Sequence, residues 1–142
     1  MRSVFPATGS ASSVHASRST RKLRVVVIDD EPDMVMMLLA LLRSERYEAK
    51  GFASGREALR NLEEFDPDVV ICDVAMPSVN GWDVAREVRR VKGAQRPLLV
   101  AISGHYTSTP DQILGKAAGF DHYLLKPCDP QVLMQLLLTV TT

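Results

Sequence analysis

A chain of 142 residues with 46% hydrophobic residues is long enough to bury the core of one domain with two or three layers. Seventeen Lys and Arg residues balance seventeen Asp and Glu residues, which gives no electrostatic reason to expect direct nucleic-acid binding. No apolar run could span a bilayer and the N-terminus lacks the apolar core of a secretory signal, so we expect no membrane insertion and a cytoplasmic location.

Residues 1–22 differ in composition from the rest of the chain. They are rich in Ser and Arg, contain no acidic residue and show no helical or strand period, which predicts a disordered tail or linker. An organelle transit peptide has a similar composition, but this segment is short and weakly amphipathic. The remaining residues, 23–142, are predicted to form one mildly acidic domain.

In residues 23–142, short β-branched runs alternate with longer apolar runs that begin at helix-capping residues. The strands are expected at residues 23–28, 47–52, 69–73, 97–102 and 121–125. The helices are expected to begin near Pro32, Ser54, Trp82, Thr109 and Asp129. Five βα repeats with right-handed crossovers predict an α/β domain with a doubly wound, five-stranded parallel sheet, (βα)5.

Local signals place some of these elements more closely. The run at 69–73 has no polar alternation, which is typical of a strand buried on both faces. The weaker pattern at 47–52 indicates an edge strand. Ser54 and Glu57 form a capping-box pattern, and Thr109 before a proline is interpreted as the cap of a later helix.

Several sulfur-containing residues are interpreted as structural. Cys72 lies in the predicted central strand and Cys128 in a predicted loop, so we expect two reduced thiols and no disulfide. Met34, Met36 and Met37 are interpreted as core residues of the first helix.

Four predicted strands end in charged or hydroxyl side chains, namely Asp29 and Asp30, Asp73, Ser103 and Lys126. The carboxyl ends of parallel strands meet at one edge of a sheet, so these groups should gather there. Clustered carboxylates repel one another, and a divalent cation removes that cost. Oxygen ligands favour Mg²⁺. With a Lys and a Ser to contact a phosphoryl group, the set predicts a phosphoryl-transfer site with Asp73 as nucleophile.

Four motifs occur in order at these strand ends. They are Asp29-Asp30-Glu31, Asp73-Val74-Ala75-Met76-Pro77 with Gly81, Ser103-Gly104, and Tyr123-Leu124-Leu125-Lys126-Pro127. Each alone is a weak signal, but together, from about residue 23 to the C-terminus, they resemble the receiver domain of two-component response regulators of the chemotaxis-regulator type. The resemblance implies a flavodoxin-like fold with strand order 2-1-3-4-5, an order taken from that family.

The resemblance also implies roles for the acidic residues. Asp73 would be the phosphoacceptor. The side chains of Asp30 and Asp73 and the carbonyl of Ala75 would bind Mg²⁺ directly, and Asp29 would act largely through water. Because Ala75 cannot orient a hydrolysing water, the phosphoryl group should be long-lived unless His105 compensates.

The resemblance assigns the remaining matched residues to signalling. Lys126 would contact the phosphoryl group, and the Lys126–Pro127 bond would be cis. Ser103 would be the switch hydroxyl, and Tyr123 the aromatic residue whose rotation accompanies its movement. Phosphorylation would bias an existing conformational equilibrium and change a surface seen by a partner.

The implied phosphoryl donor is a histidine kinase or a histidine phosphotransfer protein, and the implied output is a downstream protein target. We expect no enzymatic turnover beyond self-phosphorylation from small donors and autodephosphorylation. After Lys126 the chain has room for one helix, which favours signalling by protein–protein contact. Alternatively, the chain is the excised receiver of a hybrid kinase or multidomain regulator with residues 1–22 as a linker, although Met1 favours a complete reading frame.

Two other classes of protein are less compatible with the sequence. A haloacid-dehalogenase-type phosphatase also uses an Asp nucleophile with Mg²⁺, but its general acid is an Asp two residues later, where this chain has Ala75. A flavodoxin-like flavin binder needs a Ser/Thr/Gly-rich phosphate loop after the first strand. The acids at 29–31 would repel a flavin phosphate.

Overall fold

The computed structural model describes residues 21–76, 79–104 and 108–140. Residues 1–20 of the predicted tail and His105 therefore lie outside the described residues. The strands are β1 (Arg24–Ile28), β2 (Glu48–Phe52), β3 (Val69–Asp73), β4 (Leu98–Ser103) and β5 (His122–Leu125). The helices are α2 (Pro32–Ser44), α3 (Gly55–Arg60), α4 (Leu62–Phe65), α5 (Gly81–Lys92), α6 (Thr109–Ala118) and α7 (Pro130–Leu138).

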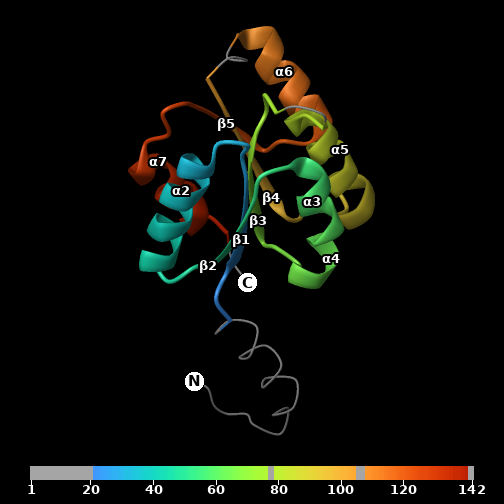
Figure 1. The fold of residues 1–142 in the computed structure, drawn as a ribbon. Helices are drawn as coiled ribbons and strands as arrows, with labels where there is room; N and C mark the ends of the chain where they lie inside the picture. The colour runs from blue at the N-terminus through green and yellow to red at the C-terminus, as the bar shows by residue number, and fades with distance from the viewer. Residues whose placement is uncertain (1–20, 77–78, 105–107, 141–142) are drawn as a thin grey trace, which may run out of the picture.

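The five strands form one parallel sheet in the order β2-β1-β3-β4-β5 (Figure 1). This confirms the predicted fold class and strand order. The three central strands β1, β3 and β4 are almost wholly buried, as their continuous apolar runs predict. Strand β2 is outermost in the sheet, which confirms its predicted edge position, and it mixes exposed and buried residues.

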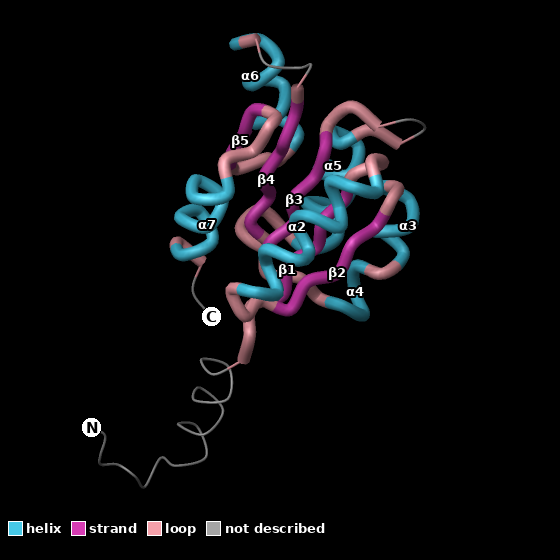
Figure 2. The backbone as a smooth tube through the Cα atoms, turned by 60° about the vertical axis from the view of Figure 1, so that its left-hand side comes forward, coloured by secondary structure: helices cyan, strands magenta, loops and turns pink. Residues whose placement is uncertain are grey.

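Helices cover both faces of the sheet (Figure 2). Helices α2 and α7 pack on one face, over a core that includes Leu38, Leu42, Leu133 and Leu137. Helices α3 to α6 cover the other face, where Val84 and other residues close a second core. No helix among the described residues is both long and apolar enough to cross a bilayer.

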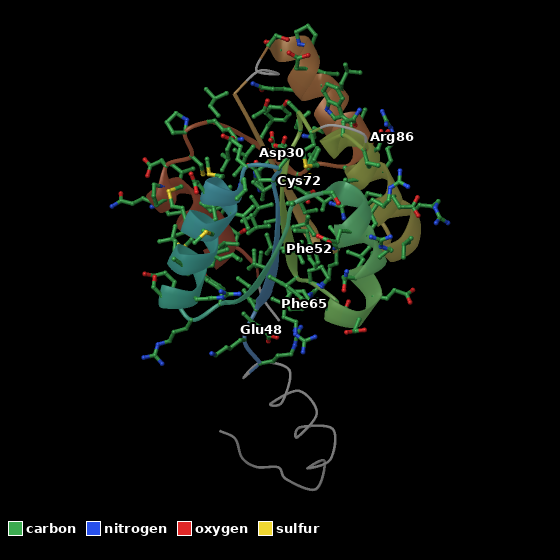
Figure 3. The ribbon with its side chains drawn as sticks, viewed as in Figure 1. Asp30, Glu48, Phe52, Phe65, Cys72 and Arg86 are labelled. Carbon is green, nitrogen blue, oxygen red and sulfur yellow. The ribbon has the colours of Figure 1, made fainter. Side chains whose placement is uncertain are left out.

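The strand register brings the functional residues of the sequence to one end of the sheet. Asp73 of β3 pairs with Ile102 of β4, so Ser103 follows one residue later on the neighbouring strand. Figure 3 shows Asp30 at this end of the sheet and Glu48 at the opposite end. The convergence predicted for the strand ends is therefore present.

Three local expectations need correction. The cap of α6 is Ser108, whose hydroxyl accepts from the Asp111 amide, and Thr109 is already helical. At α3, Ser54 caps the Glu57 amide at 3.2 Å, but the reciprocal half of the predicted capping box is absent from the described structure. In α2, Met36 and Met37 are exposed because they lie on the face turned away from the sheet.

Arg89 of α5 connects the ends of several elements. Its Nε donates to the Gly119 carbonyl at 3.0 Å, and its Nη1 donates to the Pro97 carbonyl at 2.9 Å. Its Nη2 donates to Asp121 at 2.8 Å, and the same Asp121 oxygen accepts from the amide of Leu99. The guanidinium therefore joins α5 to the end of α6 and to the starts of β4 and β5.

Arg89→Met should lower the free energy of unfolding by about 2–4 kcal/mol, because it removes the donor to the Gly119 and Pro97 carbonyls and the ion pair with Asp121. Arg90→Met is the matched control. Arg90 is highly exposed and pairs with Glu87 one turn earlier, so its loss should not change stability measurably. Urea denaturation would measure the free energy of unfolding of both variants. Equal stability of the two would contradict a structural role for Arg89.

Candidate functional site

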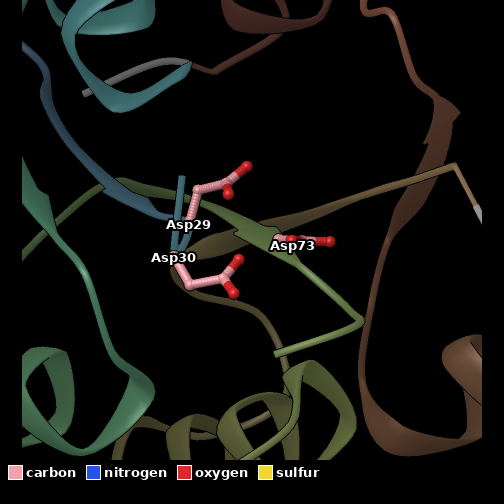
Figure 4. Close-up of side chains that lie close together, drawn as sticks. All are labelled: Asp29, Asp30 and Asp73. Carbon is pink, nitrogen blue, oxygen red and sulfur yellow. The ribbon is translucent and has the colours of Figure 1, made fainter. Parts of the chain in front are cut away.

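Three carboxylates meet at the carboxyl ends of β1 and β3 (Figure 4). Asp29 and Asp30 follow β1 directly, and Asp73 is the last residue of β3. One oxygen of each lies within 4.8 Å of one oxygen of each of the others. Asp29 and Asp73 are only 3% and 6% exposed, whereas Asp30 is exposed. Two of the three predicted acids, Asp29 and Asp73, are thus buried at the carboxyl ends of their strands, and Asp30 is exposed to solvent.

Lys126 supplies the positive charge of this cluster. Its Nζ lies 3.0 Å from Glu31 Oε1, 3.1 Å from Asp29 Oδ2 and 3.4 Å from Asp73 Oδ2. The side chain comes from the loop after β5, and its backbone amide donates to the Ser103 carbonyl at 3.0 Å. One ammonium therefore bridges strand ends that are far apart in the sequence.

Burial and charge set the protonation of these groups. Burial raises the pKa of the Asp73 carboxyl above its ordinary value, and Asp29 raises it further. The Lys126 ammonium and the amide of Ala75, which donates to Asp73 Oδ1 at 3.2 Å, oppose this shift without cancelling it. For Lys126, burial works against the charged form. Hydrogen bonds to Glu31 and Asp29 outweigh it, raise the pKa above its ordinary value and keep the ammonium charged.

The two acids after β1 differ in how their oxygens are used. Asp29 Oδ1 accepts from the Glu31 amide at 2.9 Å, and Oδ2 pairs with Lys126. Asp30 has no hydrogen bond or ion pair within the described ranges. Asp30 is therefore free to bind a cation directly, while Asp29 would have to give up a contact. This difference supports the expected division between a direct ligand and one that acts through water.

The donor set suits Mg²⁺. The candidate side-chain ligands are all carboxylate oxygens, and Mg²⁺ usually binds proteins through one or two carboxylates while keeping several waters. Asp30 is exposed, so water can reach this side of the cluster. The excess of carboxylates over the single ammonium is an electrostatic cost that a divalent cation would remove.

Gly81, the first residue of α5, approaches the backbone of the Asp73 strand end. Its amide donates to the Val74 carbonyl at 2.9 Å. A Cβ at this position would lie 2.6 Å from the Asp73 carbonyl oxygen and 2.7 Å from the Val74 Cα. Backbone atoms cannot move aside as the end of a side chain can, so only glycine fits here. This contact holds α5 against the segment that carries Asp73.

Gly81→Ala is expected to lower the free energy of unfolding by about 1–3 kcal/mol, because the clash exceeds the gain in helix propensity. Gly104→Ala is a matched control at the same end of the sheet. Its Cβ would meet the Lys126 Cβ at 3.5 Å, an ordinary contact, so stability should change by less than about 0.5 kcal/mol. Chemical denaturation of both variants tests this, and an unchanged Gly81→Ala midpoint would show that the backbone adjusts.

The two predicted switch residues lie on neighbouring strands, and Ser103 is the one beside the Asp73 strand end. Ser103, at the end of β4, is fully buried. Tyr123 of β5 is half-buried and packs near α6, where a Cβ on Gly115 would lie 3.0 Å from its ring. The Lys126–Pro127 bond is cis, as expected. The roles of Ser103 and Tyr123 in switching remain predictions.

Two features of this region were not predicted. Glu31 was part of a motif but had no assigned role, yet it makes the shortest contact to Lys126. Its only signal in the sequence was an additional acid at the strand end. Cys128 lies in the loop between β5 and α7, as expected, but the burial of its side chain in the core that α7 covers was not predicted. Both Cys72 and Cys128 are free thiols, as expected.

Comparison with known proteins gives a consistent result. A model of the response regulator receiver domain matches residues 25–138. The chain is 36% identical over 115 residues to the DNA-binding response regulator MtrA of Mycolicibacterium smegmatis, and the match covers 81% of this chain and 49% of that protein. The MtrA of Mycobacterium tuberculosis is 35% identical over the same length and share. The chain thus spans about half the length of these curated relatives.

Solved structures have the same fold. The chemotaxis protein CheY4 of Vibrio cholerae superposes with a TM-score of 0.78 at 30% identity, covering 84% of this chain and 99% of that one. The receiver domain of the sensor histidine kinase PA1611 of Pseudomonas aeruginosa has a TM-score of 0.74 at 25% identity, covering 84% and 98%. That structure has a magnesium ion coordinated in its active-site cleft. By its family model, its relatives and its fold, this chain belongs to the receiver domains of two-component response regulators.

Proposed function

We propose that the protein accepts a phosphoryl group on Asp73 in a Mg²⁺-dependent reaction and transmits the change through protein–protein contact. The observation that carries the proposal is the position of Asp73. It is a nearly buried carboxylate at the end of a parallel strand, within reach of one ammonium and beside two further acids. Catalytic groups collect at this edge of such sheets.

The proposed reaction is an in-line displacement at phosphorus. An oxygen of Asp73 forms a bond to phosphorus while the bond from phosphorus to the donor's imidazole nitrogen breaks, which leaves an acyl phosphate and the neutral imidazole after it takes up a proton. Lys126 lies where it can contact a phosphoryl oxygen. The Ala75 amide, already bonded to Asp73 Oδ1, orients the carboxylate.

The cation site proposed for this reaction uses Asp30, Asp73 and the Ala75 carbonyl as direct ligands and Asp29 through water. The exposure of Asp30 and the occupied oxygens of Asp29 support that assignment. When bound, Mg²⁺ would neutralise charge on the phosphoryl group as it transfers.

Signalling is proposed to involve Ser103 and Tyr123. Phosphorylation adds nearly two negative charges beside Asp73 and creates acceptors that the Ser103 hydroxyl can bind. Tyr123 packs against α6, so a shift at Ser103 can reach that helix. The surface around α6 and β5 would then differ between the two states and be recognised by a target protein.

The donor is proposed to be a histidine kinase or a histidine phosphotransfer protein. A second organisation, in which this receiver is one part of a larger regulator, is favoured by its match to about half of the DNA-binding response regulators named above. In that organisation the output could be DNA binding by another domain. The phosphatase and flavin-binding alternatives fit less well, because Ala75 carries no acidic group and acids occupy the loop after β1.

The experiment is incubation of the purified protein with acetyl phosphate, with and without Mg²⁺, followed by intact-mass analysis. One phosphoryl adduct that forms with Mg²⁺ and not with excess chelator is the expected result. Absence of any adduct over hours at millimolar donor would contradict the proposal, and steady release of phosphate from unrelated phosphomonoesters would favour a phosphatase.

A further inference from the structure

We infer that Glu31 is a resting-state counter-ion that holds the Lys126 ammonium away from Asp73 and so weakens phosphoryl binding at that site. The inference rests on the proposed function and adds a positioning residue to it. Glu31 lies at the N-cap of α2, where its side chain makes no capping hydrogen bond. Its carboxylate is instead directed to Lys126, 95 positions later in the sequence.

The Lys126 ammonium is not equally close to the carboxylates around it. An ammonium has three N–H donors, and Nζ of Lys126 has three carboxylates around it. The contacts to Glu31 and Asp29 are 3.0 and 3.1 Å long, whereas the contact to Asp73 is 3.4 Å. The ammonium is therefore drawn toward β1 and α2 and lies farthest from the proposed phosphoacceptor.

Of these contacts, the ion pair with Glu31 can be broken at the lowest cost in free energy. Asp29 is almost fully buried, and loss of its ammonium partner would leave a buried charge unpaired. The side chain of Glu31 is 64% exposed, so its carboxylate can return to water. Movement of Lys126 toward a phosphoryl group on Asp73 would therefore break the contact to Glu31 and keep the contact to Asp29.

The effect of Glu31 on phosphoryl binding should be small. Glu31 opposes phosphoryl binding only by the strength of a partly exposed ion pair, which corresponds to about 1.5- to 5-fold in an equilibrium constant. Glu31→Gln keeps the shape and hydrogen-bonding capacity but removes the charge. It should raise the affinity for a phosphoryl analogue by about 1.5- to 5-fold and slightly lower the affinity for Mg²⁺ alone, because one negative charge near the cation is lost.

The test titrates beryllium fluoride into the full chain at saturating Mg²⁺. Asp33→Asn is the matched control, since this exposed acid lies two positions later and has no ion-pair partner within the described ranges. It removes the same charge without touching Lys126, so its effect on both affinities should be smaller. The gain from Glu31→Gln should also shrink at high ionic strength.

A double-mutant cycle separates contact from general charge. In a Lys126→Met background, Glu31→Gln should have no more effect on beryllium fluoride binding than Asp33→Asn has. In the otherwise wild-type protein, Glu31→Gln should raise the affinity for beryllium fluoride more than Asp33→Asn does. If the two variants change that affinity equally, or if Glu31→Gln lowers it, the counter-ion role is wrong while the proposed function stands. If the wild-type protein binds no beryllium fluoride with Mg²⁺, both are overturned.

Discussion

Asp73→Asn is expected to abolish Mg²⁺-dependent phosphorylation by acetyl phosphate, because an amide nitrogen or oxygen cannot replace the carboxylate as nucleophile. Asp73 lies at the carboxyl end of the central strand β3 and is not part of the apolar core, so the variant should remain folded. Burial and repulsion by Asp29 both raise the pKa of Asp73 in the wild type, and loss of the charge relieves both costs. Stability should therefore be equal or higher, as measured by thermal denaturation.

Asp83→Asn is the control for this variant. Asp83 is an exposed residue in the first turn of α5 that pairs with Arg86, and loss of its charge should leave labelling unchanged. Persistent labelling of Asp73→Asn at the wild-type rate would remove Asp73 from the reaction and point to another carboxylate of the cluster.

Asp30→Asn is expected to weaken Mg²⁺ binding by about 100-fold, and Asp29→Asn by only about 10-fold, the lower end of what loss of an outer-sphere partner costs. The reason is that the carboxylate of Asp30 is exposed and has no bonding partner among the described residues, whereas both oxygens of Asp29 are already bonded. Mg²⁺ titration monitored by fluorescence of Trp82, the sole tryptophan, measures both affinities.

The order of the two losses is the informative result. Equal losses would mean that both acids bind the cation directly. A larger loss for Asp29→Asn would mean that its bond to Lys126 breaks when the cation binds, so that the unliganded arrangement of this residue does not persist.

Much of the fold and the acidic cluster could be predicted because both depend on regular geometry. Buried parallel strands have continuous apolar runs, and their carboxyl ends must meet at one edge. Asp29, Asp73 and Lys126 each stand directly at a strand end or immediately after one, so their proximity follows from the topology alone. The strand order came from the family resemblance, since the repeat of strands and helices does not fix it.

Other features depend on side-chain geometry that no pattern encodes. The pairing of Glu31 with Lys126 joins residues 95 positions apart and depends on the path of one flexible side chain. Arg89 looks like an ordinary helix-surface cation in the sequence, and only the fold brings Gly119 and Asp121 to it. In α2, nearly every position is apolar, so the sequence did not distinguish the exposed Met36 from the core residues.

The most direct test of the central claim is to locate the phosphoryl group by chemistry. Borohydride reduces an acyl phosphate on aspartate to homoserine, which peptide mass spectrometry can place in the sequence. After incubation with acetyl phosphate and Mg²⁺, we expect homoserine at position 73 and at no other aspartate, with none formed in chelator. Homoserine at position 29 or 30, or an adduct that resists borohydride, would contradict Asp73 as the phosphoacceptor.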